Sequence, residues 1–120
     1  MEQKNLEQLI NQFLEYLEIE KNSSKLTIRN YRLYLKRFYD WFQNEYPDQQ
    51  VTQITTDVVR KYRVFLSNYV DVYGIPLKRV TQGYYVIALR SFLRYLVRND
   101  FDTLQPERID LPRGESVSLK

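Results

Sequence analysis

The sequence predicts an all-α domain in which four helices are joined by short connections. Apolar side chains recur at spacings of three and four over four separate stretches, which is the period of a helix that buries one face. Proline, glycine and short polar runs separate these stretches. Two of the stretches also carry a basic stripe away from the apolar one. At 120 residues, the chain has the length of one domain with a single core.

A short polar break separates the first two predicted helices. The first is expected over residues 5–20 and the second over residues 25–46, ending before Pro47. Ser24 is predicted to cap the second helix, because its side-chain oxygen can accept a free backbone N–H. The apolar stripes are Leu6, Leu9, Ile10, Phe13 and Leu17 in the first helix, and Ile28, Tyr31, Leu35, Phe38 and Phe42 in the second.

The third helix follows a loop over residues 47–55. Either Thr55 or Thr56 can cap it, and Asp57 is well placed in its first turn. A second loop covers residues 70–76, where Gly74 and Pro76 argue against continuous helix. The buried stripe of this helix is predicted to be Val58, Val59, Tyr62, Phe65, Leu66 and Tyr69.

The fourth helix is expected over residues 77–99. Ala88 and Ser91 are small, so another helix is expected to cross closely there. Asp102, Pro106 and Pro112 then prevent a long helix, and residues 113–120 are predicted to be a polar tail or linker. The core side of the fourth helix is predicted to be Tyr84, Ala88, Ser91, Phe92 and Tyr95, with Tyr85 and Leu96 at its edge.

Positive charge is concentrated in the second and fourth helices. Residues 1–24 hold two lysines against five glutamates, a net charge of −3. Residues 25–46 and residues 71–100 each hold five basic residues against two acidic ones, a net charge of +3. Such concentration suits a phosphate backbone. The alternative is that these lysines and arginines only solvate the outside of a helical bundle.

Composition excludes several kinds of function. The chain has no cysteine and no histidine, so it lacks thiolate zinc sites, disulfides, the commonest general base and the commonest metal ligand. No paired-carboxylate spacing or glycine-rich phosphate loop is present. We therefore expect no catalytic residues, no metal and no cofactor in this chain. No apolar run approaches membrane-spanning length, and a cytoplasmic protein is expected.

Basic residues on the second helix are the first candidates for a nucleic-acid site. At ~100° per residue, Lys25, Arg29, Arg32 and Lys36 fall within roughly 60° of one another. Such side chains neutralise phosphates, and arginine also pairs bidentately with guanine in the major groove. Thr27 lies in the first turn, where it either helps to bind a phosphate or only caps the helix locally.

The fourth helix supplies a second set of candidates. Arg79, Arg90 and Arg94 are predicted on the face opposite its core stripe, with Gly83 and Val86 between them. Gly83 then allows close approach of either DNA or another helix, and Val86 either contacts a thymine methyl or packs under the 70–76 loop. Lys78 and Gln82 are further candidates near the helix start. Together, the two helices are expected to present their cations side by side as one cationic surface.

Three segments resemble the core-binding domain of tyrosine recombinases, the phage-integrase and Xer-like enzymes. The residues Thr27, Tyr31, Leu35 and Phe38 match the pattern of that domain's second helix. Residues 89–96, LRSFLRYL, resemble its fourth helix, and residues 109–112, IDLP, resemble the segment that leads into the catalytic domain. The likeness covers about residues 6–112.

The resemblance implies a SAM-like four-helix domain over residues 1–112 whose second and fourth helices cross on the major groove of duplex DNA. It further implies that residues 113–120 lead toward a catalytic domain absent from this chain, and that the parent protein is a tyrosine recombinase acting in DNA integration or recombination. The partners implied are double-stranded DNA and other protomers bound to the same DNA, while the isolated domain is expected to be monomeric. The subfamily, whether mobile-element integrase or Xer-type resolving enzyme, stays open.

Two other functions compete with DNA binding. A helical protein-interaction module would use the acidic first helix and exposed aromatic residues as its contact surface. A free-standing enzyme is disfavoured because no nucleophile has an accompanying base or oxyanion-stabilising cluster.

Overall fold

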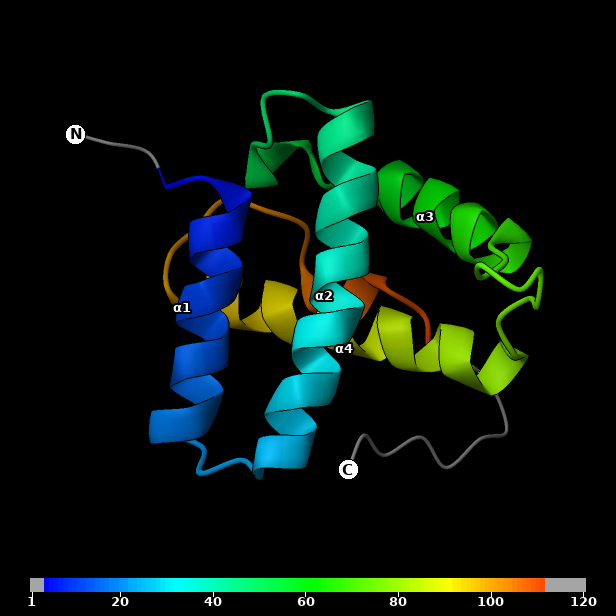
Figure 1. Cartoon of the computed structure of the whole chain (residues 1–120). Coiled ribbons are helices and arrows are strands. Elements are labelled where there is room, and N and C mark those ends of the chain that lie inside the picture. The colour runs from blue at the N-terminus through cyan, green and yellow to red at the C-terminus, as the bar shows by residue number, and fades with distance from the viewer. Residues whose placement is uncertain (1–3, 112–120) are drawn as a thin grey trace.

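Four α-helices form the core in the computed structural model, which describes residues 4–111 (Figure 1). α1 and α2 lie side by side and run in opposite directions, and α4 crosses both of them (Figure 1). α3 packs against α4 on the far side of α2 (Figure 1). The elements are α1 (Leu6–Ile19), α2 (Lys25–Glu45), η1 (Val51–Gln53), α3 (Thr56–Asn68), α4 (Arg79–Arg98) and η2 (Pro106–Arg108). The predicted all-α fold is confirmed.

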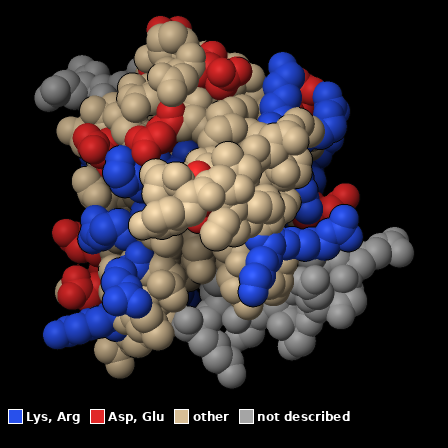
Figure 2. Space-filling model, turned by 45° about the vertical axis from the view of Figure 1, so that its right-hand side comes forward, with Lys and Arg blue, Asp and Glu red and all other residues tan. Residues whose placement is uncertain are grey.

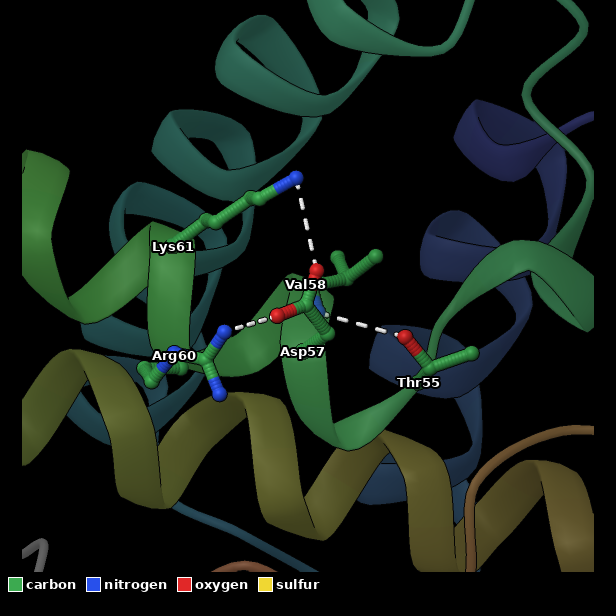
Figure 3. Close-up of polar contacts among 5 residues, drawn as sticks. All are labelled: Thr55, Asp57, Val58, Arg60 and Lys61. Atoms are coloured by element: carbon green, nitrogen blue, oxygen red, sulfur yellow. Dashed lines mark hydrogen bonds and ion pairs between the residues drawn. The ribbon is translucent and has the colours of Figure 1, made fainter.

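Side-chain caps fix where the first three helices begin. Asn5 caps α1, and the Ser24 hydroxyl accepts from the backbone N–H of Thr27 at 3.1 Å, as the sequence predicts. At α3 the cap is Thr55, whose hydroxyl accepts from the Val58 N–H at 3.2 Å (Figure 3). Each cap satisfies a backbone donor that the first helical turn leaves free, which is worth about 1 kcal/mol. The helix boundaries are therefore encoded locally.

Aromatic side chains from all four helices meet in the core. The Phe13 ring of α1 lies 5.7 Å from the Phe92 ring of α4, measured between centroids. On the other side of the core, Phe38 of α2 meets the edge of Tyr62 of α3 at 5.0 Å. All four rings are essentially inaccessible to solvent. Because rings of this size bury large apolar areas, four helices suffice for a core.

The predicted core stripes are confirmed at the centres of α1, α2 and α3 and weaken toward their ends. Leu17 and Ile28, which flank the α1–α2 turn, are only partly buried, whereas Leu14 is buried without having been predicted. Val51 and Ile54 of the first loop are also buried. The tail predicted for residues 113–120, and the domain boundary at residue 112, lie outside the described residues. None of the helices within residues 4–111 is both long and apolar enough to cross a membrane.

Candidate nucleic-acid interface

The basic stripe of α2 is exposed along its length. Lys25, Arg29, Arg32 and Lys36 are all open to solvent. The Lys36 ammonium lies 3.2 Å from the Asp40 carboxylate one turn later, in an exposed pair that is worth only a few tenths of a kcal/mol. Within residues 4–111, neither Arg29 nor Arg32 has an acidic partner within 4.0 Å. The charge of this stripe is therefore largely available to a ligand.

Arg32 and Lys36 point toward α1 rather than toward α4. They line a groove between α1 and α2 together with Ile10, Leu14 and Tyr39. Tyr34 lies on the side of α2 that meets α4, because its ring packs against Tyr85. At ~100° per residue, Tyr34 and Lys36 point in directions that differ by roughly 160° around the helix axis. The expectation of one continuous cationic surface is therefore wrong for these two residues, because α1 and α4 occupy different sides of α2.

The flank of α2 beside α4 carries polar groups of another kind. Thr27 and Asn30 share this flank with Tyr34, whose ring lies 4.7 Å from Tyr85 and 6.4 Å from Tyr84 of α4. Thr27 is half-buried, and its hydroxyl accepts a hydrogen bond from Ser24 at 3.0 Å. Asn30 was missed from the sequence. Its amide pairs well with adenine, and its spacing of three from Thr27 and four from Tyr34 was the available signal.

α4 departs from the prediction because it is enclosed on several sides. It contacts α1, α2, α3 and η2, whereas a single buried stripe was predicted from the sequence. Gly83 and Val86, expected between the arginines on the outer face, are buried, with Val86 only 2% exposed. Val86 is therefore a core residue, and a contact with a thymine methyl is ruled out without rearrangement. Ser91 and Tyr84, predicted in the core stripe, are only half-buried.

The part of α4 that stays open is a narrow arc along the helix. Its centre is marked by the partly or fully exposed side chains Val80, Tyr84, Ile87, Ser91, Arg94 and Arg98. Lys78 and Arg79 are exposed at the helix start. The Gln82 side-chain amide donates to the Leu77 carbonyl at 3.0 Å, so it serves the local turn.

Arg90 has a structural partner. Its Nε donates to the backbone carbonyl of Pro106 at 3.0 Å, and it is half-buried. This bond joins the middle of α4 to η2 and the segment that follows. The Arg90 side chain is therefore partly engaged within the domain, because the segment after α4 covers this side of the helix.

Three cations from two separated segments gather in one pocket, here called the basic pocket. Its volume is about 190 Å³. Lys21, from the turn after α1, joins Arg94 and Arg98 of α4, and none of the three has an acidic partner within 4.0 Å among the described residues. The remaining lining residues are Phe13, Tyr16, Leu17, Tyr31, Ser91 and Tyr95. Positive charge and hydroxyl donors in one concave site suit a phosphate oxyanion.

Of the three cations in the basic pocket, only Arg94 was predicted from the sequence as a site residue. Arg98 lies one turn after Arg94, so helical spacing was a usable signal for it. Lys21 carried no such signal, because only the tertiary crossing of α1 and α4 brings it near them. The Tyr95 ring lies 4.9 Å from the Tyr16 ring, and burial, followed by the nearby Glu20 and Glu15 carboxylates, raises the pKa of Tyr95. Tyr95 therefore stays a neutral hydroxyl at ordinary pH.

The basic residues of α3 provide an internal contrast. Arg60 and Lys61 both pair with the Asp57 carboxylate, the lysine at 3.3 Å (Figure 3). Arg63 donates to the Asp110 carbonyl at 2.9 Å. The positive charge of α3 is therefore partly offset by Asp57, whereas the cations of the basic pocket have no acidic group within 4.0 Å among the described residues.

The structure is a four-helix domain with exposed basic residues on α2 and α4, and comparison with known proteins identifies its family. Residues 10–100 match the family model described as the phage integrase N-terminal SAM-like domain. The chain belongs to this family, which confirms the resemblance drawn from the three sequence segments. No solved structure matches the chain at a comparable level of significance.

The relatives are tyrosine recombinases named XerC. The chain is 34% identical to the Oceanobacillus iheyensis protein over 96 residues, covering 80% of this chain and 29% of that protein. It is 30% identical to the Bacillus subtilis protein over 113 residues, covering 93% and 35% of the two chains. It is 37% identical to the Halalkalibacterium halodurans protein over 93 residues, covering 77% and 28%. The chain therefore spans about a third of the length of these curated relatives.

Proposed function

We propose that this chain is the DNA-binding module of a site-specific tyrosine recombinase, and that it grips duplex DNA where α2 crosses α4. The observation that carries the proposal is the basic pocket, in which Lys21, Arg94 and Arg98 converge without acidic partners in the described structure. Family membership supports it, because the matching relatives are named as recombinases. In this proposal, other protomers on the same DNA are further partners, and catalysis belongs to a separate domain.

Phosphate binding is assigned to the rim of the interface. A phosphate in the basic pocket would meet three cations, with Ser91 and Tyr31 as neutral donors. Lys25 of α2 and Lys78 and Arg79 of α4 stand at the two helix starts and extend the positive surface. Contacts of this kind set the position and register of a protein on DNA without reading its sequence.

Base contacts are assigned to the flank of α2 that lies beside α4. Asn30 is suited to adenine and Thr27 to either a base or a phosphate, whereas Arg29 lies with the basic stripe, roughly 140° around the helix from Tyr34. Arg32 and Lys36 lie off this flank, so they would reach a backbone phosphate only from the side. Gln82 and Arg90 serve mainly to position α4, given their bonds to Leu77 and Pro106.

A charge-matched pair of double variants tests the proposal. We expect Arg94→Ala with Arg98→Ala to weaken binding of the 120-residue chain to a mixed-sequence duplex, measured by fluorescence anisotropy. The slope of log affinity against log salt should fall in magnitude by about 2, since each phosphate contact contributes roughly 0.9. The control, Arg60→Ala with Lys61→Ala, removes the same charge from α3 and should leave that slope nearly unchanged. Equal losses in both double variants would leave only diffuse charge attraction and contradict a specific phosphate site.

A second pair tests the base-reading flank. Asn30→Ala should reduce discrimination among duplex sequences once a preferred site has been selected from a random pool, by about 1–3 kcal/mol at one base pair. Arg32→Ala, on the other side of α2, should weaken binding to all duplex sequences by the same factor. If Arg32→Ala reduces discrimination and Asn30→Ala does not, the bases are read from the groove between α1 and α2 instead.

A further inference from the structure

The loop between α3 and α4 holds a fixed shape. Val70 and Pro76 form an antiparallel bridge, and the Asp71 N–H donates to the Ile75 carbonyl at 3.0 Å. The Asp71 carboxylate accepts from the backbone N–H groups of Tyr73 and Ile75 at 2.8 and 3.0 Å. Gly74 supplies the left-handed conformation, with φ of 77°, that closes the turn. These bonds give this loop the rigidity of a small hairpin.

This hairpin loop presents apolar side chains to solvent. Val72 is 92% exposed, Tyr73 84% and Ile75 59%. Figure 2 brings this side of the molecule forward and shows a broad, mostly uncharged area at its centre, with a little acidic surface inside it and lysines and arginines at the margins. Asp71 of the hairpin loop is itself exposed. Exposed apolar side chains gathered on one rigid loop make it a candidate site of protein contact. Lys78 and Arg79 give the border next to the hairpin loop a positive charge.

The end of α1 has the complementary character. Ile19 is 72% exposed, and the exposed residues around it are three acids and one base: Glu15, Glu18, Glu20 and Lys21. Glu15 lies one helical turn before Ile19, so the apolar side chain has an acidic border. The two patches are far apart on one molecule, with the end of α1 at the lower left of Figure 1 and the hairpin loop at the right-hand edge.

We propose that the hairpin loop of one copy packs against the Ile19 end of α1 in a second copy. The pairing matches an apolar centre with an apolar centre and a basic border with an acidic one. A second copy fits better than DNA, because apolar side chains gain more by leaving water against protein and because the acidic α1 end repels phosphates. Since the two patches differ, the contact is head-to-tail, and it can link copies into a ring or a chain.

The expected contact is weak. Each patch presents only a few side chains, well below the area of a stable dimer, so the contact forms when copies are already close together. The contact does not require DNA binding, and the trapping experiment below uses protein alone.

Disulfide trapping tests the contact directly, because the natural chain has no cysteine. We would prepare the full chain with Val72→Cys and, separately, with Ile19→Cys, mix them in equal amounts and oxidise them at high concentration. A disulfide requires the two Cα atoms to come within about 7 Å. The mixed 19–72 product should exceed the statistical yield several-fold. Val64→Cys, 55% exposed on α3, should give only statistical products with either partner.

Charge reversal supplies a second measurement. Adding Glu15→Lys and Glu18→Lys to the Ile19→Cys chain should return the mixed product to the statistical level. Glu7→Lys, on an exposed acid at the other end of α1, should leave the excess unchanged. A statistical mixture throughout would overturn the proposal, as would an excess of the 72–72 product, which would indicate a symmetric loop-to-loop contact. Protection of Cys at position 72 from alkylation by a duplex alone, without a mixed product, would assign the hairpin loop to DNA and also overturn it.

Discussion

α2 and α4 carry similar sequence patterns but occupy different environments. α2 lies on the outside of the bundle, so one complete face is open and its basic stripe is exposed from Lys25 to Lys36. α4 contacts three other helices and η2, and only a narrow arc of it stays open. A basic residue on α2 is therefore available by default, whereas each one on α4 depends on which neighbour lies beside it. Arg90 meets the C-terminal segment and Arg94 meets the basic pocket.

The largest expected effect separates the two sides of α4. Val86→Asp should prevent folding, because an isolated carboxylate in the core costs several kcal/mol, and Val86→Ala should destabilise the domain by about 2 kcal/mol. Arg94→Asp should leave the unfolding free energy within about 0.5 kcal/mol of its original value. Urea denaturation followed by circular dichroism measures all three. If the Val86→Asp protein is folded and stable, Val86 lies on the outer face of α4 and not in the core.

The next effect concerns the bond that sets Arg90 apart from the other arginines. Arg90→Ala should lower the unfolding free energy by about 1.5 kcal/mol, because the Pro106 carbonyl loses a charged donor. Amide hydrogen exchange near Ile109 should accelerate at the same time. Arg29→Ala, the matched change on open α2, should do neither. If both variants are equally stable, the bond between Arg90 and Pro106 does not contribute to stability. Arg90 of α4 and Arg29 of α2 would then not differ in this respect.

A smaller effect tests the buried side of α2, where Phe38 packs against Tyr62. Among the described residues, the Tyr62 hydroxyl is buried without a hydrogen-bond partner, and burial raises its pKa well above the usual value of 10.0. Tyr62→Phe should therefore be neutral or stabilise the domain by about 1 kcal/mol. Loss of stability in this variant would reveal a partner for the hydroxyl.

The same tyrosine makes stability depend on alkaline pH. Its raised pKa in the folded state contributes stability that is fully present below pH ~10 and lost above it, because only the unfolded state ionises there. Tyr34, Tyr85 and Tyr95 have raised pKa values through burial and act in the same direction. Denaturation measured across the alkaline range should show a shallower decline for Tyr62→Phe than for the natural chain.

The smallest effect is expected on the open face of α2. Lys36→Ala removes an exposed pair with Asp40 and should change the unfolding free energy by about 0.3 kcal/mol. A loss above roughly 1 kcal/mol would mean that this face is not simply solvated. The same thermal or urea denaturation series detects it.

Local signals made most of the fold predictable. Ser24 and Thr55 are caps whose side chains act within three residues, so the sequence alone contains both partners. The alternation of apolar residues on α2 likewise predicts Leu35, Phe38 and Phe42 as buried. These features depend on neighbours along the chain rather than on how the helices pack.

The candidate site was less predictable because it is assembled by packing. Helical spacing predicts Gly83 and Val86 on the side opposite the apolar stripe of α4. Because α4 has several neighbours, most of its circumference is buried, and both residues lie inside. Lys21 joins Arg94 and Arg98 across elements that are distant in sequence. The side of α2 that faces α4 was equally invisible from the sequence, since it depends on the direction in which the helices cross.

The anchored segment after α4 gives the domain a mechanical property. Ile109 is buried, Arg90 holds the Pro106 carbonyl, and Arg63 holds the Asp110 carbonyl. Tension applied to the chain at Leu111 would thus load α3 and α4 through these three points before it reaches α1 or α2. A displacement of this segment would therefore act first on α4, the helix that carries Arg94 and Arg98.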